Sequence, residues 1–194
     1  MVYLTNTVLL NYRDYIKKIF PQLLGYLING ELILKVSALK ITRLLRFLKH
    51  NTNSQYKILI DICAVDFPYK KNRFEIIYNL LSLTYNSRIT ISTFVNEKSI
   101  ALSCTNIYSA AGWFEREVWD MFGIFFIEHY DLRRILTDYG FKGHPLRKDF
   151  PLTGFTEIRY YDSEKRIILE EVSLAQDYRT FYFDNTWSRT QNIK

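Results

Sequence analysis

Glycine, proline and cysteine are scarce in this sequence of 194 residues, which contains 7, 4 and 2 of them. Few glycines and prolines, together with 48% hydrophobic residues, exclude a collagen-like, linker-like or disordered chain. The two cysteines, Cys63 and Cys104, belong to no C-x-x-C motif. Alone they cannot provide a four-cysteine zinc site or hold an iron–sulfur cluster. Nothing in the sequence supports a disulfide between them, so we expect a reducing compartment.

Long apolar runs are also missing. No stretch approaches the roughly 18 residues that a membrane helix needs, and the densest ones, 58–65 and 76–83, are interrupted by Asp61 and Asn79. The first residues show neither a basic region followed by an apolar stretch nor an Arg-rich amphipathic pattern. We therefore expect neither a signal peptide nor a transit peptide.

Residue types with A- and T-rich codons are plentiful. Ile, Tyr, Phe, Lys and Asn account for 75 of the 194 residues. An AT-rich coding genome explains this bias without any folding reason. Aromatic residues reach 16% of the chain and call for a further explanation.

Charge divides the chain into two unlike parts. Residues 1–110 carry 14 Lys and Arg against 6 Asp and Glu, a net charge of +8, whereas residues 111–194 carry 12 against 14, a net charge of −2. The second part is also richer in aromatics, with 18 in 84 positions against 14 in 110. We predict an α+β domain over 1–110, and a helix followed by an extended tail over 111–194.

Helical periodicity occurs twice in residues 1–110. Apolar residues at helical spacing over 8–19 end before Pro21, and Ser37 is placed to cap a second helix. The second helix has apolar residues at i, i+3, i+4 and i+7 and a basic opposite face. Its apolar stripe is Ile41, Leu44, Leu45 and Leu48, and its basic face is Lys40, Arg43, Arg46, Lys49 and His50.

Strand patterns surround these helices. Residues 31–36 alternate between apolar and polar, and further candidates follow over 56–65, 74–83 and 88–95. The last three are joined by short polar turns, which favour antiparallel pairing. We therefore expect the α+β class, with a small, mostly antiparallel sheet and helices packed on one face.

One helix is clear in the second part. It runs from residue 109 or 110 to 122, and Gly123 follows where a left-handed C-terminal residue belongs. Its apolar face is Phe114, Val118, Met121 and Phe122. After Ile124 the periodicity largely fails, yet Phe, Tyr and Trp remain frequent. We expect this long extended segment to wrap around partner proteins and to be buried there.

Charged side chains are dense over residues 115–149, with 7 acidic and 6 basic. This balance indicates paired charges, and Arg116 can pair with Asp120 at i, i+4. In a solvated helix such a pair contributes about 0.3–0.5 kcal/mol. Trp and Phe interleaved with these charges are the residue types that anchor interfaces, which favours a docking surface over a solvated helix face.

Two other functions are compatible with parts of the sequence. His129, Asp131 and His144 are the residue types of a two-histidine, one-carboxylate iron site, although the spacing is permissive and no strand pattern surrounds them. The net charge of +8 in the first part, with its basic helix face, would suit a nucleic-acid-binding domain. However, Lys and Arg are spread rather than clustered, and no aromatic RNA-binding strand motif is present.

Residues 111–124, AGWFEREVWDMFGI, resemble the signature of the 30 kDa subunit family of respiratory complex I, the NADH dehydrogenase of the respiratory chain. The resemblance continues over 131–141, DLRRILTDYGF, and 143–154, GHPLRKDFPLTG, and more weakly upstream and downstream to Trp187. Two places depart from the family pattern. An extra tyrosine stands in YYD at 160–162, and EHYD at 128–131 replaces the usual Gly-His-Pro-Asp, which loosens the local turn.

The resemblance implies a structural and assembly subunit of the peripheral arm of complex I, in its quinone-reducing module. Complex I passes electrons from NADH through FMN and iron–sulfur clusters to ubiquinone and couples this transfer to proton translocation. The family subunit holds no cofactor or metal and supplies no catalytic residue. It packs against the quinone-site and iron–sulfur subunits, binds no nucleic acid, and meets the membrane only through the complex.

The same resemblance, with the codon bias, suggests a location. We expect the matrix side of the mitochondrial inner membrane and a mitochondrial gene. The alternative is the cytoplasmic face of a bacterial inner membrane.

Twelve signature residues are implied to act in structure or docking. The helix would provide a partnered charge cluster of Glu115, Arg116, Glu117 and Asp120. Neighbouring subunits would be bound by Arg133, Arg134, Arg147, Lys148 and Asp149. The set is completed by Asp131, Asp138 and His144.

Overall fold

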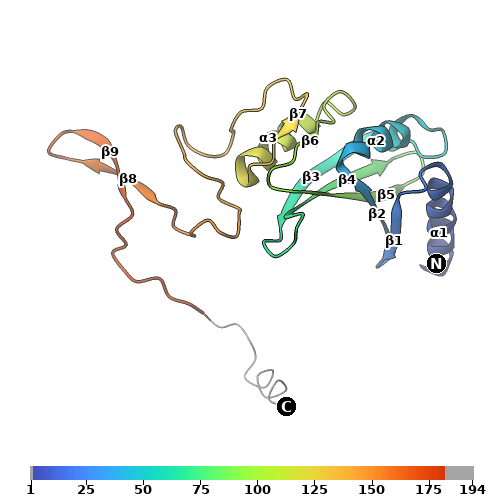
Figure 1. Cartoon of the computed structure of the whole chain (residues 1–194), viewed down its shortest axis with the longest axis horizontal. Coiled ribbons are helices and arrows are strands. Elements are labelled where there is room, and N and C mark those ends of the chain that lie inside the picture. The colour runs from blue at the N-terminus through green and yellow to red at the C-terminus, as the bar shows by residue number, and fades with distance from the viewer. Residues whose placement is uncertain (1, 182–194) are drawn as a thin grey trace, which may run out of the picture. The chain divides into compact units, whose positions relative to one another are not determined.

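The computed structural model describes residues 2–181, with side chains from residue 7 onward. Contacts divide the chain into two compact units, Met1–Phe150 and Pro151–Lys194. The first unit contains, in chain order, α1 (Val2–Ile19), β1 (Leu24–Ile28), β2 (Glu31–Ser37), the 3-10 turn η1 (Ala38–Lys40), α2 (Ile41–His50), β3 (Ile58–Asp66), β4 (Phe74–Ser82), β5 (Ser87–Val95), β6 (Ala101–Leu102), α3 (Ala111–Phe122) and β7 (Phe126–Ile127). The second contains β8 (Thr156–Tyr161) and β9 (Arg166–Glu171) (Figure 1).

A five-stranded sheet with the order β1-β2-β5-β4-β3 forms the centre of the first unit. Every neighbouring pair is antiparallel except β2 and β5, which run parallel. The register aligns Leu34 with Ile91, Ile91 with Tyr78, and Tyr78 with Ile62, so one row of large apolar side chains crosses four strands. The predicted mostly antiparallel sheet is confirmed.

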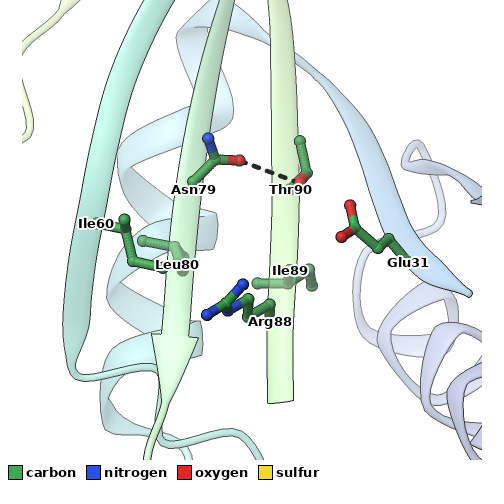
Figure 2. A pocket seen from close by; sticks show the side chains of 7 residues that line it. All are labelled: Glu31, Ile60, Asn79, Leu80, Arg88, Ile89 and Thr90. Carbon is green, nitrogen blue, oxygen red and sulfur yellow. Dashed lines mark hydrogen bonds between the residues drawn. The ribbon is translucent and has the colours of Figure 1, made fainter.

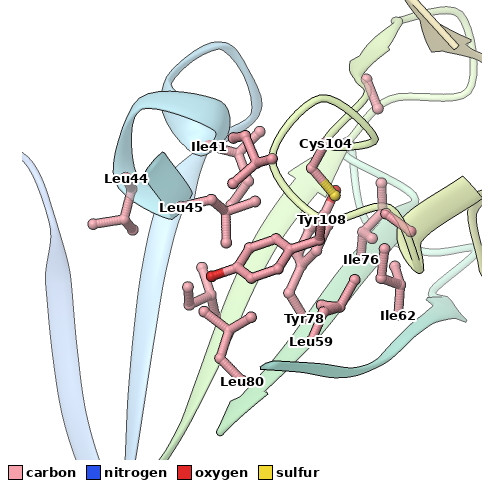
Figure 3. Packing of buried hydrophobic residues seen from close by; sticks show 14 of the residues in the cluster. Ile41, Leu44, Leu45, Leu59, Ile62, Ile76, Tyr78, Leu80, Cys104 and Tyr108 are labelled. Atoms are coloured by element: carbon pink, nitrogen blue, oxygen red, sulfur yellow. The ribbon is translucent and has the colours of Figure 1, made fainter. Parts of the chain in front are cut away.

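One face of this sheet carries the core. Along β4 the side chains of Phe74, Ile76, Tyr78 and Leu80 are buried, and each neighbour between them is only partly buried. All four residues of the predicted α2 stripe are at most 1% exposed, and they pack against this row (Figure 3). Burial of each such leucine or isoleucine contributes about 1.5–3 kcal/mol.

All three helices contribute to the same core cluster, so they cover the same face of the sheet. The cluster takes Ile16 from α1 and Val118 and Phe122 from α3. The ring of Phe122 meets that of Phe74 edge-on at a centroid distance of 6.4 Å. The predicted helices on one face are confirmed. None of the described helices is long and apolar enough to cross a membrane.

Two features differ from the patterns expected from the sequence. Ser37 makes no side-chain capping bond, because the chain enters α2 through η1 and Ser37 lies three residues before the last residue of that turn. Strand β1 was not expected, because a five-residue strand in which no residue is fully buried leaves a weak alternation. It pairs with β2 at the sheet edge.

The division by contacts also differs from the division by composition at residue 110. Helix α3 and Ile124 and Phe126 after it belong to the same core as the sheet, so residues 111–150 fold with the first unit. Part of the aperiodic tail is regular, since β8 and β9 pair as an antiparallel hairpin. Trp187, the last residue of the family resemblance, lies outside the described residues.

Candidate functional site

Asp120, on α3, organises the segment that follows the helix. Its carboxylate is fully buried and accepts hydrogen bonds from the backbone N–H groups of residues 135–137, at 2.8–3.2 Å, and from the hydroxyl of Thr137 at 2.7 Å. The guanidinium of Arg134 donates to it at 3.2 Å. Burial by itself raises the pKa of Asp120, but the hydrogen bonds outweigh burial and hold the pKa below its ordinary value. The side chain is therefore a charged anchor for the loop.

Glu115 lies earlier on α3 and has fewer hydrogen-bond donors around it than Asp120. It is fully buried and accepts hydrogen bonds from the Ser103 hydroxyl and the Cys104 N–H, both at 2.7 Å, and from the Cys104 thiol at 3.1 Å. Burial raises the pKa of Glu115 above its usual range, against the opposing effect of these donors. Glu115 thus ties α3 to the chain just after β6.

His129 lies beside Glu115, with Nε2 4.0 Å from the carboxylate. The backbone N–H of Asp131 donates to Nδ1 at 3.1 Å, so this nitrogen carries a lone pair. Nε2 then bears the proton and donates to the Gly112 carbonyl at 3.1 Å. The ring connects the loop to the start of α3.

The hydrogen bonds of Arg116 go to two loop carbonyls and not to Asp120, its predicted i, i+4 partner. Its Nε donates to the carbonyl of Arg133 at 3.0 Å, and its guanidinium also reaches the carbonyl of Arg134 at 3.3 Å. The cation of Asp120 is Arg134 instead. An i, i+4 spacing shows that two side chains of a helix can meet. Here, however, the guanidinium of Arg116 donates to the loop carbonyls instead.

The C-terminal end of α3 is closed by a second part of the loop. Gly123 adopts a φ of 74°, and a Cβ built on it would lie 2.5 Å from Nε2 of His144. His144 donates from Nδ1 to the Asp120 carbonyl at 3.0 Å, and Arg147 donates from Nε to the Phe122 carbonyl at 2.6 Å. These groups satisfy carbonyls that a helix end leaves without partners. Burial lowers the pKa of His144, and the nearby arginines lower it further.

The end of the segment is fastened to the β3–β4 hairpin. Asp66 is buried, and its carboxylate accepts hydrogen bonds from Nε and from a terminal nitrogen of Arg73, at 2.7 and 2.8 Å. The Lys148 N–H donates to the same carboxylate at 2.8 Å, and Arg73 also pairs with Asp149 at 3.0 Å. The bonds from Arg73 hold the pKa of Asp66 and that of Asp149 below their ordinary values.

The twelve signature residues therefore separate into two groups. Seven form the contacts inside the chain described above: Glu115, Arg116, Asp120, Arg134, His144, Arg147 and Asp149. Glu117, Asp138 and Lys148 have exposed side chains, and Asp131 pairs at 2.9 Å with Arg133, whose side chain is 72% exposed. Docking to neighbours, which the sequence suggested for Arg134 and Arg147, stays a prediction, whereas their contacts inside the chain are observed.

Two exposed aromatics of this region do not belong to the twelve signature residues. Trp113 is 64% exposed, and the Arg116 guanidinium lies over its ring at 5.1 Å. Tyr130 is 77% exposed and stacks on His129 at 5.1 Å. A Cβ on Gly112 would lie 2.9 Å from the Tyr130 hydroxyl. Together with Arg133, whose carbonyl Arg116 binds, these two aromatics form the α3 patch.

Within the part of the chain that the structure describes, no three His, Cys, Asp or Glu side chains gather as a ligand set. Both cysteines are free, and Cys104 donates to Glu115. His129 and His144 of the suggested iron site bond to separate helix carbonyls, those of Gly112 and Asp120.

The sheet face opposite the helices carries two shallow hollows, of about 290 and 490 Å³. In the smaller one Glu31 and Arg88 lie over the strands, and Thr90 donates to Asn79 at 3.1 Å (Figure 2). Neither lining contains a histidine or a cysteine. These hollows present a mixed polar and apolar surface rather than the groups of an acid–base or nucleophilic site.

Comparison with known proteins identifies the family. The model of the family described as respiratory-chain NADH dehydrogenase, 30 Kd subunit, matches residues 34–156. The chain belongs to this family. It is 54% identical over 179 residues to NADH-ubiquinone oxidoreductase subunit 9 of Reclinomonas americana, covering 91% of this chain and 88% of that one.

A bacterial relative and a solved structure agree. A subunit of the NADH-quinone oxidoreductase of Paramagnetospirillum magneticum is 49% identical, over 90% of this chain and 89% of the relative. A chain of the membrane-bound sulfane sulfur reductase, an archaeal respiratory membrane complex, superposes with a TM-score of 0.64 at 28% identity, over 73% of this chain and 85% of that chain.

The chain is thus a subunit of complex I, the NADH:ubiquinone oxidoreductase of the respiratory chain, and partners with other subunits of that complex. The nucleic-acid-binding alternative finds no support. Relatives from a eukaryote and a bacterium agree with both the mitochondrial and the bacterial location.

Proposed function

We propose that this 30 kDa family member is a cofactor-free scaffold of the peripheral arm of complex I, and that its α3 patch docks with the quinone-site and iron–sulfur subunits. The patch consists of Trp113, Tyr130 and Arg133. We further propose the matrix side of the mitochondrial inner membrane as its location, with the cytoplasmic face of a bacterial membrane as the alternative.

One observation carries this proposal: the patch is exposed although the groups behind it are fixed. Arg116 is 8% exposed, lies over the ring of Trp113, and binds the carbonyl of Arg133. Tyr130 is held through its stack on His129, which is itself bonded at both nitrogens. Tryptophan, tyrosine and arginine dominate the binding energy of interfaces, and fixed side chains lose little entropy on docking.

The second unit supports the same proposal. Its hairpin exposes large apolar side chains along both strands, each more than half exposed: Ile158, Tyr160, Ile167 and Leu169. Arg159 and Glu170 form a two-bond ion pair across the strands. An isolated two-stranded hairpin is marginally stable in water, so a partner surface that covers these side chains would stabilise it.

The absence of a cofactor is proposed from the ligand chemistry. The sequence has two cysteines, and an iron–sulfur cluster takes four thiolates or a close equivalent. Burial raises the pKa of the Cys104 thiol well above its usual value, and the Glu115 carboxylate raises it further, so this sulfur is a poor metal ligand. The redox groups of the complex would then belong to other subunits.

The double variant Trp113→Ala/Arg133→Ala tests the docking role, with Tyr69→Ala/Lys71→Ala as the matched control. Tyr69 and Lys71 are an exposed aromatic and an exposed cation in the β3–β4 turn. Removing interface anchors typically costs more than about 1 kcal/mol each, so the test variant should lower the amount of assembled complex on native gels. The control should leave that amount unchanged.

Unchanged assembly in the Trp113→Ala/Arg133→Ala variant would contradict the proposal. Far-ultraviolet circular dichroism and urea unfolding of the purified variant chain check that it folds. Both side chains are exposed, so the unfolding midpoint should match that of the unaltered chain.

A further inference from the structure

A second surface of the first unit combines positive charge with an apolar hollow. Residues 15–60 contain eight Lys and Arg and one acidic residue, Glu31. Exposed cations stand on neighbouring elements, with Lys18 in the last turn of α1, Lys40 at the end of η1, and Arg43 and Arg46 on α2. The α3 contacts described above use none of these four.

A hollow of about 340 Å³ is lined by two of these cations. Its lining comes from the end of α1, the connection to β1, the end of β2, η1 and the start of α2. Ile19, Phe20 and Val36 supply apolar wall, while Lys40 and Arg43 supply the charged part. We call this hollow and its flanking cations the basic groove.

The cations of the groove are not neutralised within the described chain. Among residues 7–181 no carboxylate lies within ion-pair distance of Lys18, Lys40, Arg43 or Arg46, and the ammonium of Lys40 donates a hydrogen bond to the neutral amide of Gln22. In contrast, Arg73, Arg134 and Arg147 each contact a carboxylate of this chain. Grouped like charges repel, and an anionic partner would relieve that repulsion.

We propose that the basic groove binds an acidic segment of another subunit of the same complex, with one large apolar side chain of that segment seated in the hollow. Charge complementarity selects an anionic partner. A concave apolar lining selects a protruding side chain, as in the pockets that hold interface anchors. The choice of a fellow subunit as the occupant rests on the proposed docking function, but the groove is a different surface from the α3 patch.

Carbodiimide cross-linking of the detergent-solubilised, assembled complex tests this inference, because the reagent joins amines directly to carboxylates. We expect peptides that link Lys18 or Lys40 to an Asp or Glu of another subunit. These links should be lost in the Arg43→Glu/Arg46→Glu variant and retained in Lys70→Glu/Lys71→Glu. The control places the same charge change on the exposed β3–β4 turn.

Lysine acetylation of the unaltered complex keeps the test independent of variants that fail to assemble. Lys18 and Lys40 should react more slowly in the complex than in the purified chain, whereas Lys71 should react equally in both. Equal reactivity of Lys18 and Lys40 in both samples would overturn the proposal.

Protection that disappears when lipid is stripped with the subunits still assembled would also overturn it, because the occupant would then be an anionic membrane surface. A cross-link to a second copy of this chain would do the same. The docking proposal for the α3 patch fails separately, through normal assembly of its own variant.

Discussion

Two carboxylates of one helix show how the surroundings of a residue decide its chemistry. Asp120 accepts three backbone N–H groups, a hydroxyl and a guanidinium, and its pKa lies below the ordinary 3.8. Glu115 accepts a hydroxyl, an N–H and a weak thiol donor, and burial lifts its pKa above the ordinary 4.5. The surroundings of Asp120 favour its ionised form, whereas burial of Glu115 favours its protonated form.

The two groups should give opposite dependences of stability on pH. Because the folded pKa of Asp120 is lowered, its contribution is present above about pH 4 and is lost as the pH falls through the folded pKa. Asp120→Asn should therefore cost about 1–3 kcal/mol at pH 7, with the cost shrinking toward pH 3. Because the folded pKa of Glu115 is raised, its contribution is present below about pH 4.5 and declines as the pH rises.

Glu115→Gln should therefore become more favourable, relative to the unaltered chain, as the pH rises from about 4.5 to 7. Urea unfolding of the purified chain from about pH 3.5 to 7 measures both variants. Parallel pH profiles for the two would show that their environments do not differ as described.

Glu128 has a φ of 66°, a left-handed conformation that costs a side-chain-bearing residue about 1–2 kcal/mol. Glu128→Gly should stabilise the chain by about 1 kcal/mol, because glycine lacks the Cβ that clashes. Glu117→Gly, an exposed glutamate of α3 with helical backbone, should destabilise it by a similar amount. A lower unfolding midpoint for Glu128→Gly would refute this interpretation.

At the scale of elements, the sequence predicted well where one pattern decided the outcome. The α2 stripe of Ile41, Leu44, Leu45 and Leu48 is buried as its spacing indicates, and Gly123 ends α3 in the left-handed conformation. The β8–β9 hairpin was missed. Its strands are short and mostly exposed, and the polar–apolar alternation in β8 extends over only four residues, 157–160, which is a weak signal.

The end of α3 and the loop after it should behave as one element. Gly123→Ala places a Cβ against His144 and also strains a φ of 74°, whereas Gly140→Ala strains a φ of 73° with nothing within 4 Å of the new Cβ. The strain common to both is about 1–2 kcal/mol, and the clash adds to it at Gly123 alone. Urea unfolding should give Gly123→Ala the larger loss. Equal losses would mean that His144 moves aside without cost.

For the whole molecule, the sequence indicated the family and the region of the site but not the arrangement of its residues. Charge density over 115–149 pointed to paired groups, yet the partners of Asp120 are mostly backbone N–H groups 15–17 residues away. Spacing along a helix does not reveal such contacts, because they depend on how the loop folds back. For the same reason the sequence could not show that Arg147 closes α3 while Arg133 stays exposed.

The proposed scaffold role implies that this subunit stabilises the assembled complex and supplies no catalytic residue. NADH:quinone activity per assembled complex, measured for Trp113→Ala/Arg133→Ala and for Glu115→Gln, distinguishes this role from a catalytic one. We expect less assembled complex for the first variant and unchanged activity per assembled complex for both. Full assembly with a strongly reduced activity per complex in either variant would contradict it.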